Sequence, residues 1–165
     1  MKDLNYMDIA EDAIKKIKKG AFLTVKAGNA LNTMTIGWAL FGFIWQKPIM
    51  MVAVRLTRHT FGIIEKATDF TVTVPAGGMV KEIAFCGTKS GRDVDKLKMC
   101  NLEIINSQKV ASPIIKTPGY HFECKIVYKS AMNAAFLDKD YDAFLYQQKD
   151  YHTLYFGEIL TCYET

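Results

Sequence analysis

The sequence predicts a mainly β protein, built as an antiparallel barrel or sandwich with helical additions. Short apolar runs of strand length follow one another from Ala21 onwards and are separated by Gly, Asn and Pro. No long helical pattern alternates with these runs, as it would in a doubly wound parallel sheet. Because 165 residues, 50% of them hydrophobic, are the size of one ordinary domain, we expect a single domain spanning residues 1–165.

The first predicted element is an amphipathic helix at about residues 8–19. Apolar residues recur there at helical spacing, and Asp8 fits an N-cap with Glu11 three residues later. Gly20 follows a lysine-rich last turn, which is typical of the end of a helix.

Six strands are expected after this helix, with three short helices between them. The strand ranges are 21–26, 33–40, 49–54, 70–74, 120–129 and 153–161. The helix ranges are 59–67, capped by Thr57 or Thr60, then 80–86, and finally 94–99, capped by Asp93. The helices are therefore additions around a β core.

Composition and motif content exclude several classes of function. Lys and Arg number 21 against 17 for Asp and Glu, a net charge of +4 without a basic block, so nucleic-acid binding is not indicated. The four cysteines form no C-x-x-C pair and the three histidines stand far apart, so we expect no metal. No apolar stretch has the length of a signal peptide or a membrane span, so we expect a cytoplasmic protein that binds no membrane.

The segment 32–38 places polar side chains at consecutive positions within a strand-like pattern. Asn32, Thr33 and Thr35 offer both donors and acceptors, which suits the edge of a ring that carries alternating carbonyl and N–H groups. The alternative is a half-exposed strand whose threonines simply have good β-propensity.

The segment 55–60 follows the next apolar run. Arg55 and Arg58 flank Thr57, and Thr60 begins a predicted helix, so cationic, hydroxyl and helix N–H donors can converge on one anion. Solvated arginines around a helix cap are the alternative. Taken together, the two segments predict a pocket for a flat, phosphorylated cofactor.

Two further segments carry candidate binding residues. The polar loop 88–93 contains Ser90 and precedes Lys96, and it fits either a phosphate cover or a solvated connection. His152 precedes the last strand, which contains Tyr155, and a histidine beside tyrosines is more often structural than catalytic. The tyrosines at 141, 146, 151 and 155 fit a lid, a subunit interface or plain packing.

No catalytic triad order, nucleophile elbow, phosphate-binding P-loop or dinucleotide fingerprint is present in the sequence. Any chemistry must therefore come from a cofactor.

These segments resemble the flavin reductase-like family of FMN-binding split barrels, and most closely its flavoredoxin-type branch. The resemblance runs from about Gly20 to the end of the chain and is carried by the segments 32–38, 45–55, 57–60, 90–96 and 152–159. It implies a six-stranded split barrel, usually a homodimer, with FMN near the subunit interface. Leu56 stands where many relatives have proline and His59 where many have tyrosine, so proline does not pre-organise this turn.

The resemblance also implies roles for individual residues. The residues implied to flank the flavin ring are Asn32, Thr33, Met34, Thr35 and Trp38. Those implied at the phosphate end are Arg55, Thr57, Arg58 and Thr60, with Ser90 and Lys96 completing the pocket. His152 and Tyr155 would close the ring face or approach a nicotinamide. No residue of the protein is implied to act as an acid or base, because hydride transfer is the chemistry of the cofactor.

Three functional hypotheses follow. The first is an FMN-containing oxidoreductase that takes electrons from NADH or NADPH and passes them to free flavin, a metal complex or a protein. The second is a non-enzymatic electron carrier with permanently bound FMN and a redox protein as donor. The third is a binding module on the same barrel without redox chemistry. Sequence gives little basis for choosing between the first two, because both need the same pocket.

Overall fold

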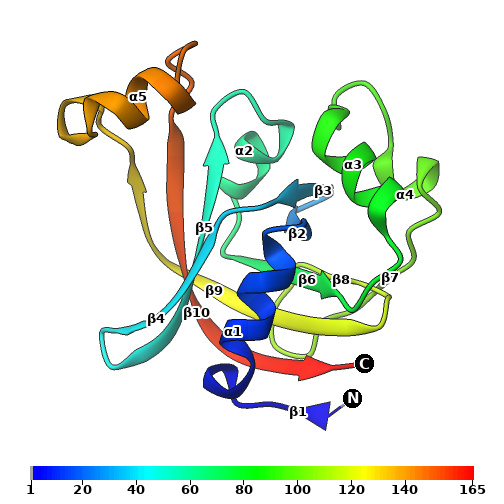
Figure 1. Cartoon of the computed structure of the whole chain (residues 1–165). Helices are drawn as coiled ribbons and strands as arrows, with labels where there is room; N and C mark the ends of the chain where they lie inside the picture. Colours follow the sequence, from blue (N-terminus) through cyan, green and yellow to red (C-terminus); the bar gives the residue numbers. More distant parts are fainter. Residues whose placement is uncertain (1) are drawn as a thin grey trace.

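The computed structural model describes residues 2–165, and it contains one curled antiparallel sheet with helices around it (Figure 1). The long strands are β2 (Ala21–Ala27), β3 (Ala30–Ile36), β4 (Ala39–Ile44), β5 (Lys47–Arg55), β6 (Asp69–Pro75), β9 (Gly119–Ala131) and β10 (His152–Glu164). The short strands are β1 (Lys2–Asp3), β7 (Ile104–Ile105) and β8 (Ile114–Ile115). The predicted mainly β class with helical additions is confirmed.

The main sheet contains eight of the described strands, where the sequence led us to expect six. Seven of them follow the order β3-β2-β6-β9-β10-β5-β4, and β1 pairs with β10. The strands β7 and β8 form a separate pair. All seven strand pairings of this sheet within the described residues are antiparallel, so the sheet is built from hairpins and longer connections, without parallel crossovers.

Five α-helices and a short 3₁₀ helix lie around the sheet within the described residues. They are α1 (Tyr6–Ile17), α2 (His59–Ile64), α3 (Val80–Thr88), α4 (Lys96–Met99), η1 (Ala134–Phe136) and α5 (Lys139–Leu145). In Figure 1, α1 crosses the front of the sheet, α3 and α4 lie on one side, and α5 lies at the opposite upper corner.

Two helices start at residues other than those predicted, because other side chains cap them. The Asn5 side chain accepts a hydrogen bond from the first turn of α1, so the helix begins before Asp8. The Asp95 carboxylate caps α4 in the same way, so this helix begins after Asp93, the predicted cap.

The predicted hydroxyl cap of α2 is also absent, since Arg58 is the N-cap residue and makes no side-chain capping bond. The Thr57 hydroxyl donates instead to the Asp150 carboxylate at 2.6 Å. The Thr60 hydroxyl accepts from the Asn32 amide at 2.7 Å. The two hydroxyl groups therefore connect the start of α2 to Asp150 and to Asn32 on β3.

The prediction of one strand over residues 33–40 is wrong, because the chain breaks at Gly37 and Trp38 into β3 and β4. These two strands lie at opposite ends of the sheet order, so two residues connect the two ends of the sheet. The sheet must curl for this short connection to be made, and the curling produces a barrel. The turn from β4 to β5 uses Trp45 and Gln46, both with positive φ, which matches the twist of a tight hairpin.

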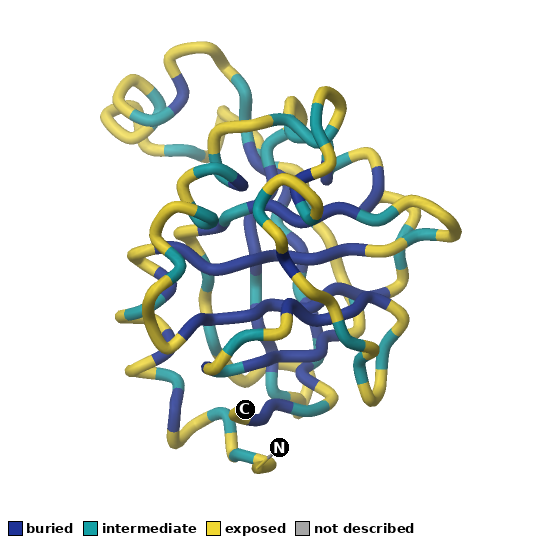
Figure 2. The backbone as a smooth tube through the Cα atoms, turned by 90° about the vertical axis from the view of Figure 1, so that its right-hand side faces the viewer, coloured by how far each residue is buried: buried dark blue, intermediate teal, exposed yellow. Residues whose placement is uncertain are grey.

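The apolar core fills the inside of the curled sheet. Figure 2 shows the buried strands crossing the middle of the molecule, with exposed residues gathered in the loops. The helix α1 adds Ile17 to this core, which includes Phe70 and Phe122 from neighbouring strands. At Gly157 of β10, a Cβ atom would lie only 2.6 Å from the Phe70 ring, so glycine permits this close packing.

His121 on β9 is a fully buried polar residue within the sheet. Its Nδ1 lies 3.2 Å from the Thr73 hydroxyl and its Nε2 lies 2.9 Å from the Thr165 hydroxyl. The ring also stacks on Tyr163 with centroids 5.4 Å apart. Burial lowers the pKa of His121 to about 4, so the folded protein holds this ring neutral.

We expect the free energy of unfolding to decrease when the pH falls from 7 to 5.5. An unfolded histidine titrates near pH 6.5, whereas folded His121 stays neutral down to about pH 4, so the unfolded chain binds the extra proton in this window. The stabilisation is fully present above about pH 6.5 and is lost as the pH falls toward 4, about 1 kcal/mol being lost by pH 5.5. Urea unfolding at the two pH values measures this loss. His121→Asn should reduce the loss, and an unchanged loss would contradict the assignment.

Candidate functional site

An open cleft of about 350 Å³ lies where β3 passes into β4. Its walls are the end of β3 with Gly37 and Trp38, the end of β5, and His152 at the start of β10. The strands β5 and β10 are neighbours, with Arg55 opposite His152. Among the described strands β3 pairs with β2 alone, so backbone N–H and C=O groups along its other edge have no strand partner.

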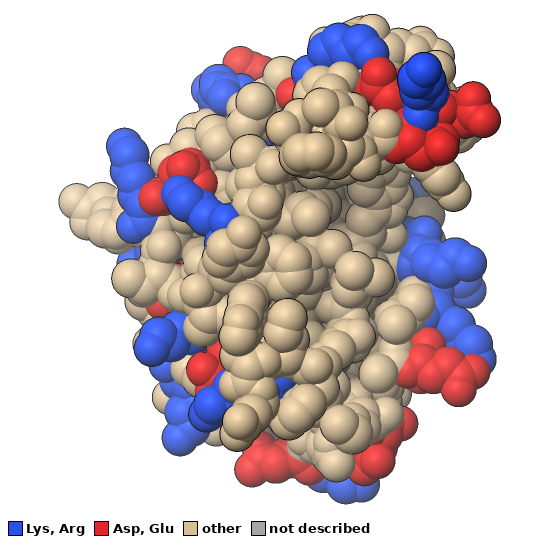
Figure 3. All heavy atoms as spheres, turned by 90° about the vertical axis from the view of Figure 1, so that its left-hand side faces the viewer, with Lys and Arg blue, Asp and Glu red and all other residues tan. Residues whose placement is uncertain are grey.

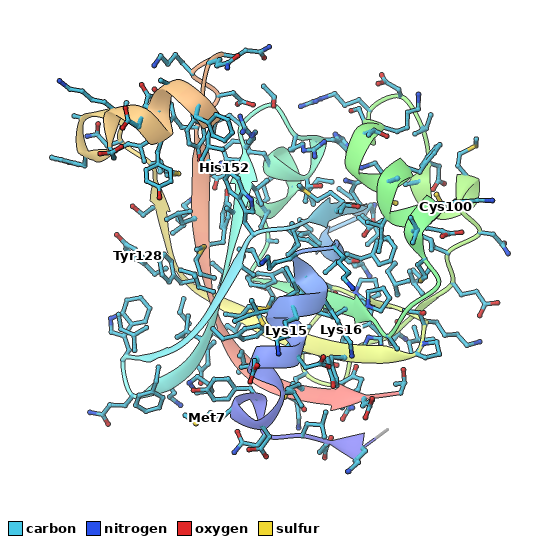
Figure 4. All side chains as sticks on the ribbon, viewed as in Figure 1. Met7, Lys15, Lys16, Cys100, Tyr128 and His152 are labelled. Carbon is cyan, nitrogen blue, oxygen red and sulfur yellow. The ribbon has the colours of Figure 1, made fainter. Side chains whose placement is uncertain are left out.

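Trp38 and His152 form one side of the cleft, with ring centroids 4.9 Å apart. The indole is 46% exposed, whereas the imidazole is nearly buried. His152 lies beside the α5 end of the molecule, as its label in Figure 4 shows. Burial, followed by the positive charge of Arg55, lowers the pKa of His152 to about 4, so the ring is neutral near pH 7.

Arg55 lines the same cleft, but its guanidinium forms hydrogen bonds with backbone carbonyls of the protein. Nη1 donates to the carbonyl of Asp150 at 3.0 Å, and Nη2 donates to the carbonyl of Leu145 at 3.1 Å. The guanidinium also lies over the Tyr146 ring, 5.0 Å from its centroid. Arg55 therefore holds the segment before β10 against the end of β5.

A smaller recess of about 160 Å³ adjoins the cleft, and the two share Met34, Thr57 and Arg58. The cationic side chains that line the recess are Arg58, Lys89, Arg92 and Lys96, and the hydroxyl groups are those of Thr57, Thr60, Thr88 and Ser90. No carboxylate is among the described residues that line it. The recess is therefore suited to an anion.

Lys96 is the most unusual residue of the recess, because it is only 4% exposed. Its ammonium donates to the carbonyls of Thr33 at 3.1 Å and Cys86 at 2.8 Å, and burial lowers its pKa. It forms no ion pair with a carboxylate anywhere in residues 2–165. A buried ammonium without an opposite charge is unfavourable, so this position favours a bound anion.

Two more features shape the recess. The half-buried Arg58 donates from Nη1 to the carbonyl of Gly87 at 2.7 Å, and burial together with Arg55 lowers its pKa. A Cβ atom on Gly91 would lie 2.4 Å from Oδ1 of Asn32, so the loop approaches β3 this closely only because it has glycine there.

The structure separates the predicted site residues into two groups. Those at the recess are Thr57, Arg58, Thr60, Ser90 and Lys96. Those at the cleft are Met34, Thr35, Trp38, Arg55 and His152, with Met34, Thr57 and Arg58 lining both. Arg55 and Arg58 were expected to meet at one phosphate, but the guanidinium of Arg55 is directed to the segment 145–150.

Three predicted residues line neither cavity. The Asn32 amide donates to Thr60, and Thr33 is fully buried with its hydroxyl 3.1 Å from that of Thr24. Tyr155, expected near the nicotinamide face, is buried in the core and its hydroxyl donates to Glu65 at 2.6 Å.

Thr35 lines the cleft, but its hydroxyl donates to the carbonyl of Ile83. The backbone of β3 is therefore the better source of donors for a ligand in the cleft.

Sequence reasoning did not single out Tyr146 as part of the site. Its hydroxyl lies 2.7 Å from Nδ1 of His152, and its ring is 2% exposed. The only sequence signal was the series of tyrosines before the last strand. Arg92 lies in the polar loop 88–93 that the sequence singled out, but it was given no role of its own; its guanidinium donates to the carbonyl of Thr57 at 2.9 Å.

Within the part of the chain that the structure describes, no three His, Cys, Asp or Glu side chains gather as metal ligands would. None of the described helices is both long enough and apolar enough to cross a membrane.

Comparison with known proteins gives the same kind of fold. The model of the flavin reductase like domain matches residues 19–165. A protein of Pyrococcus abyssi without an assigned function is 30% identical over 81% of this chain and 66% of its own length, so the chain spans about two thirds of this curated relative.

Two solved structures resemble most of the chain. Flavoredoxin from Methanosarcina acetivorans is 25% identical, with a TM-score of 0.68 over 88% of this chain and 68% of that chain. An FMN-binding protein from Thermus thermophilus, with bound 1-cyclohex-2-enone, is 20% identical, with a TM-score of 0.69 over 88% of this chain and 69% of that chain. The shared fold confirms the expected split-barrel class.

Proposed function

Because the chain belongs to the family of flavin reductase-like domains, we propose that residues 1–165 act as one FMN-binding oxidoreductase domain. The observation that carries this proposal is the buried ammonium of Lys96, which has no carboxylate partner in the described residues and lies in a cationic recess beside an open cleft. The two adjoining cavities, about 350 and 160 Å³, suit a ligand with a bulky ring and a small anionic end.

The residues present fit both ends of such a ligand. In the recess, Lys96 and Arg58 would hold the phosphate together with the Ser90 hydroxyl. Thr60 accepts a bond from Asn32, so its own proton is free to be donated. The likeness to an FMN-binding protein and to a flavoredoxin supports this assignment.

At the cleft, the free edge of β3 from Met34 to Ile36 would hold the edge of the flavin ring through backbone groups. Trp38 and His152 would border the ring from the opposite side of the cleft. When bound, FMN supplies hydride and electron transfer, which explains why no acid or base of the protein is needed.

We propose that NADH or NADPH is the electron donor and that free flavin or another acceptor receives the electrons. The cleft is open to solvent and Trp38 in its wall is 46% exposed, which supports access of a second molecule to the bound flavin. The alternative is a non-enzymatic electron carrier that receives electrons from a protein, and the likeness to flavoredoxin favours it.

We also propose that the chain forms a homodimer through its apolar face. This face is formed by the β4–β5 hairpin and the neighbouring part of β9, and its exposed residues are Leu40, Phe43, Ile44, Trp45, Val127 and Tyr128. Figure 3 views this side of the molecule and shows the charged side chains mainly at its margins. Contiguous exposed apolar surface of this kind is typical of an interface.

Replacing Lys96 by methionine should weaken FMN binding about tenfold while leaving riboflavin binding nearly unchanged. The phosphate is the part of the ligand that the ammonium would contact, and one bond to a charged group contributes about 1.5 to 3 kcal/mol. Fluorescence titration of the apoprotein with the two flavins measures the difference. Lys98→Met, on the same short helix but with an exposed side chain, is the matched control. An equal loss of affinity for both flavins would show that Lys96 does not contact the phosphate.

Anaerobic mixing of the FMN-loaded protein with NADH or NADPH should bleach the flavin absorbance within seconds. The expected reason is that the open cleft admits the nicotinamide beside the flavin. Bleaching only by a reduced protein donor, with no response to either nicotinamide, would instead establish the carrier. A colourless preparation that cannot be loaded with FMN would support the third hypothesis, a binding module on the same barrel without redox chemistry.

The apolar face can be tested by sedimentation equilibrium of the wild-type protein and of Phe43→Glu. Phe43 is 63% exposed on β4, so the charge should dissociate a dimer without loss of the fold. Lys66→Glu, at an exposed residue outside this face, is the matched control. A wild-type protein that sediments as a monomer at micromolar concentration would argue against the homodimer.

A further inference from the structure

We propose that Tyr146 is a positioning residue that fixes His152, so that Nε2 of the imidazole presents an N–H group to the cleft. This role of Tyr146 follows from the contacts of the segment between β9 and β10. The part of the inference that concerns the reaction rests on the proposed function, whereas the tautomer of the ring does not.

The segment before β10 is held firmly against the cleft wall. Arg55 donates to two of its carbonyls, at 3.0 and 3.1 Å, and the Asp150 carboxylate accepts from Thr57 at 2.6 Å. The Tyr146 ring stacks on Tyr151 with centroids 5.0 Å apart and is packed under the Arg55 guanidinium. The phenol therefore has little freedom to leave His152.

The hydroxyl of Tyr146 has one proton and two neighbouring acceptors. Nδ1 of His152 lies at 2.7 Å, and the sulfur of Met132 lies at 3.3 Å. A thioether is a weak acceptor, whereas an unprotonated imidazole nitrogen is a strong one. We therefore assign the phenol as donor to Nδ1, which places the ring proton of neutral His152 on Nε2.

The Nε2 atom of His152 is accessible from the cleft. It forms no hydrogen bond with any residue from 2 to 165. Every buried side-chain nitrogen or oxygen in these residues has a hydrogen-bond partner, so Nε2 is not a buried atom. Because His152 lines the cleft, this nitrogen is exposed there. The group at this position is a neutral N–H donor beside the indole of Trp38, at a ring distance of 4.9 Å.

A neutral donor beside an aromatic ring suits a planar molecule that carries a carbonyl oxygen. In the proposed function this molecule is the electron donor or acceptor that enters the cleft, and His152 would orient it by a hydrogen bond to that oxygen. Tyr146 would act only through His152, because it does not line the cleft. Arg55 would act one step further away, by holding the segment that carries the phenol.

The experiment is nitrogen-15 NMR of the histidine side chains, which reports the protonation of each ring nitrogen. The chain has three histidines, and His152→Gln identifies the signals of His152 by their disappearance. In the wild-type protein at pH 7, we expect one tautomer, with the proton on Nε2. In Tyr146→Phe, we expect a mixture of both tautomers, while the signals of His59 and His121 stay unchanged.

Tyr151→Phe is the matched control. The Tyr151 hydroxyl donates to Asp142 and not to His152, so this variant removes a phenolic hydroxyl from the same segment without touching the imidazole. The wild-type tautomer should persist in Tyr151→Phe. A proton on Nδ1 in the wild-type protein would overturn the proposal, and this measurement needs no variant to fold. An unchanged tautomer in Tyr146→Phe, or the same mixture in both variants, would also overturn it.

FMN titration of the wild-type protein separates this inference from the proposed function. Binding of FMN together with the Nε2 tautomer supports both. If the tautomer is found without FMN binding, the role of His152 in the reaction is overturned and only its positioning by Tyr146 is supported.

Discussion

The curling of the sheet is the constraint on which the rest of the structure depends. The strands β3 and β4 lie at the two ends of the sheet order, yet only Gly37 and Trp38 connect them. This short connection brings the free edge of β3 against the ends of β5 and β10 and creates the cleft between them. The position of the candidate site is therefore a consequence of how the barrel closes, since no single loop could place these three strand ends together.

The recess contains an arrangement of cationic side chains that is unfavourable in the absence of an anion. Lys96 is buried with only carbonyl oxygens around its ammonium, and Arg58 lies half-buried nearby. Two desolvated cations in one small space destabilise a protein unless an anion joins them. The carbonyl groups of Thr33 and Cys86 reduce this cost, because they hydrogen-bond the ammonium even when the recess contains no anion.

The two arginines of the segment 55–60 have different functions in the structure. Arg58 lines the recess, whereas Arg55 holds the chain segment that leads to Tyr146 and His152. The side of the cleft that carries His152 thus depends on a cation that would not itself touch a phosphate. A loss of ligand binding in an Arg55 variant would report the packing of this segment as much as any direct contact.

The sequence by itself determined the mainly β class and the amphipathic first helix, and it singled out the polar segments 32–38 and 55–60. These features depend on local periodicity and on the chemistry of neighbouring residues, which a sequence displays directly. Only the tertiary structure decided that residues 33–40 are two strands, that Thr33 and Tyr155 are buried, and that Tyr146 contacts His152. Those outcomes depend on which strand ends meet when the sheet closes. Tyr155 contacts Glu65, and Arg55 holds Leu145 in the segment that carries Tyr146; each pair is 90 positions apart, and local sequence patterns do not show such contacts.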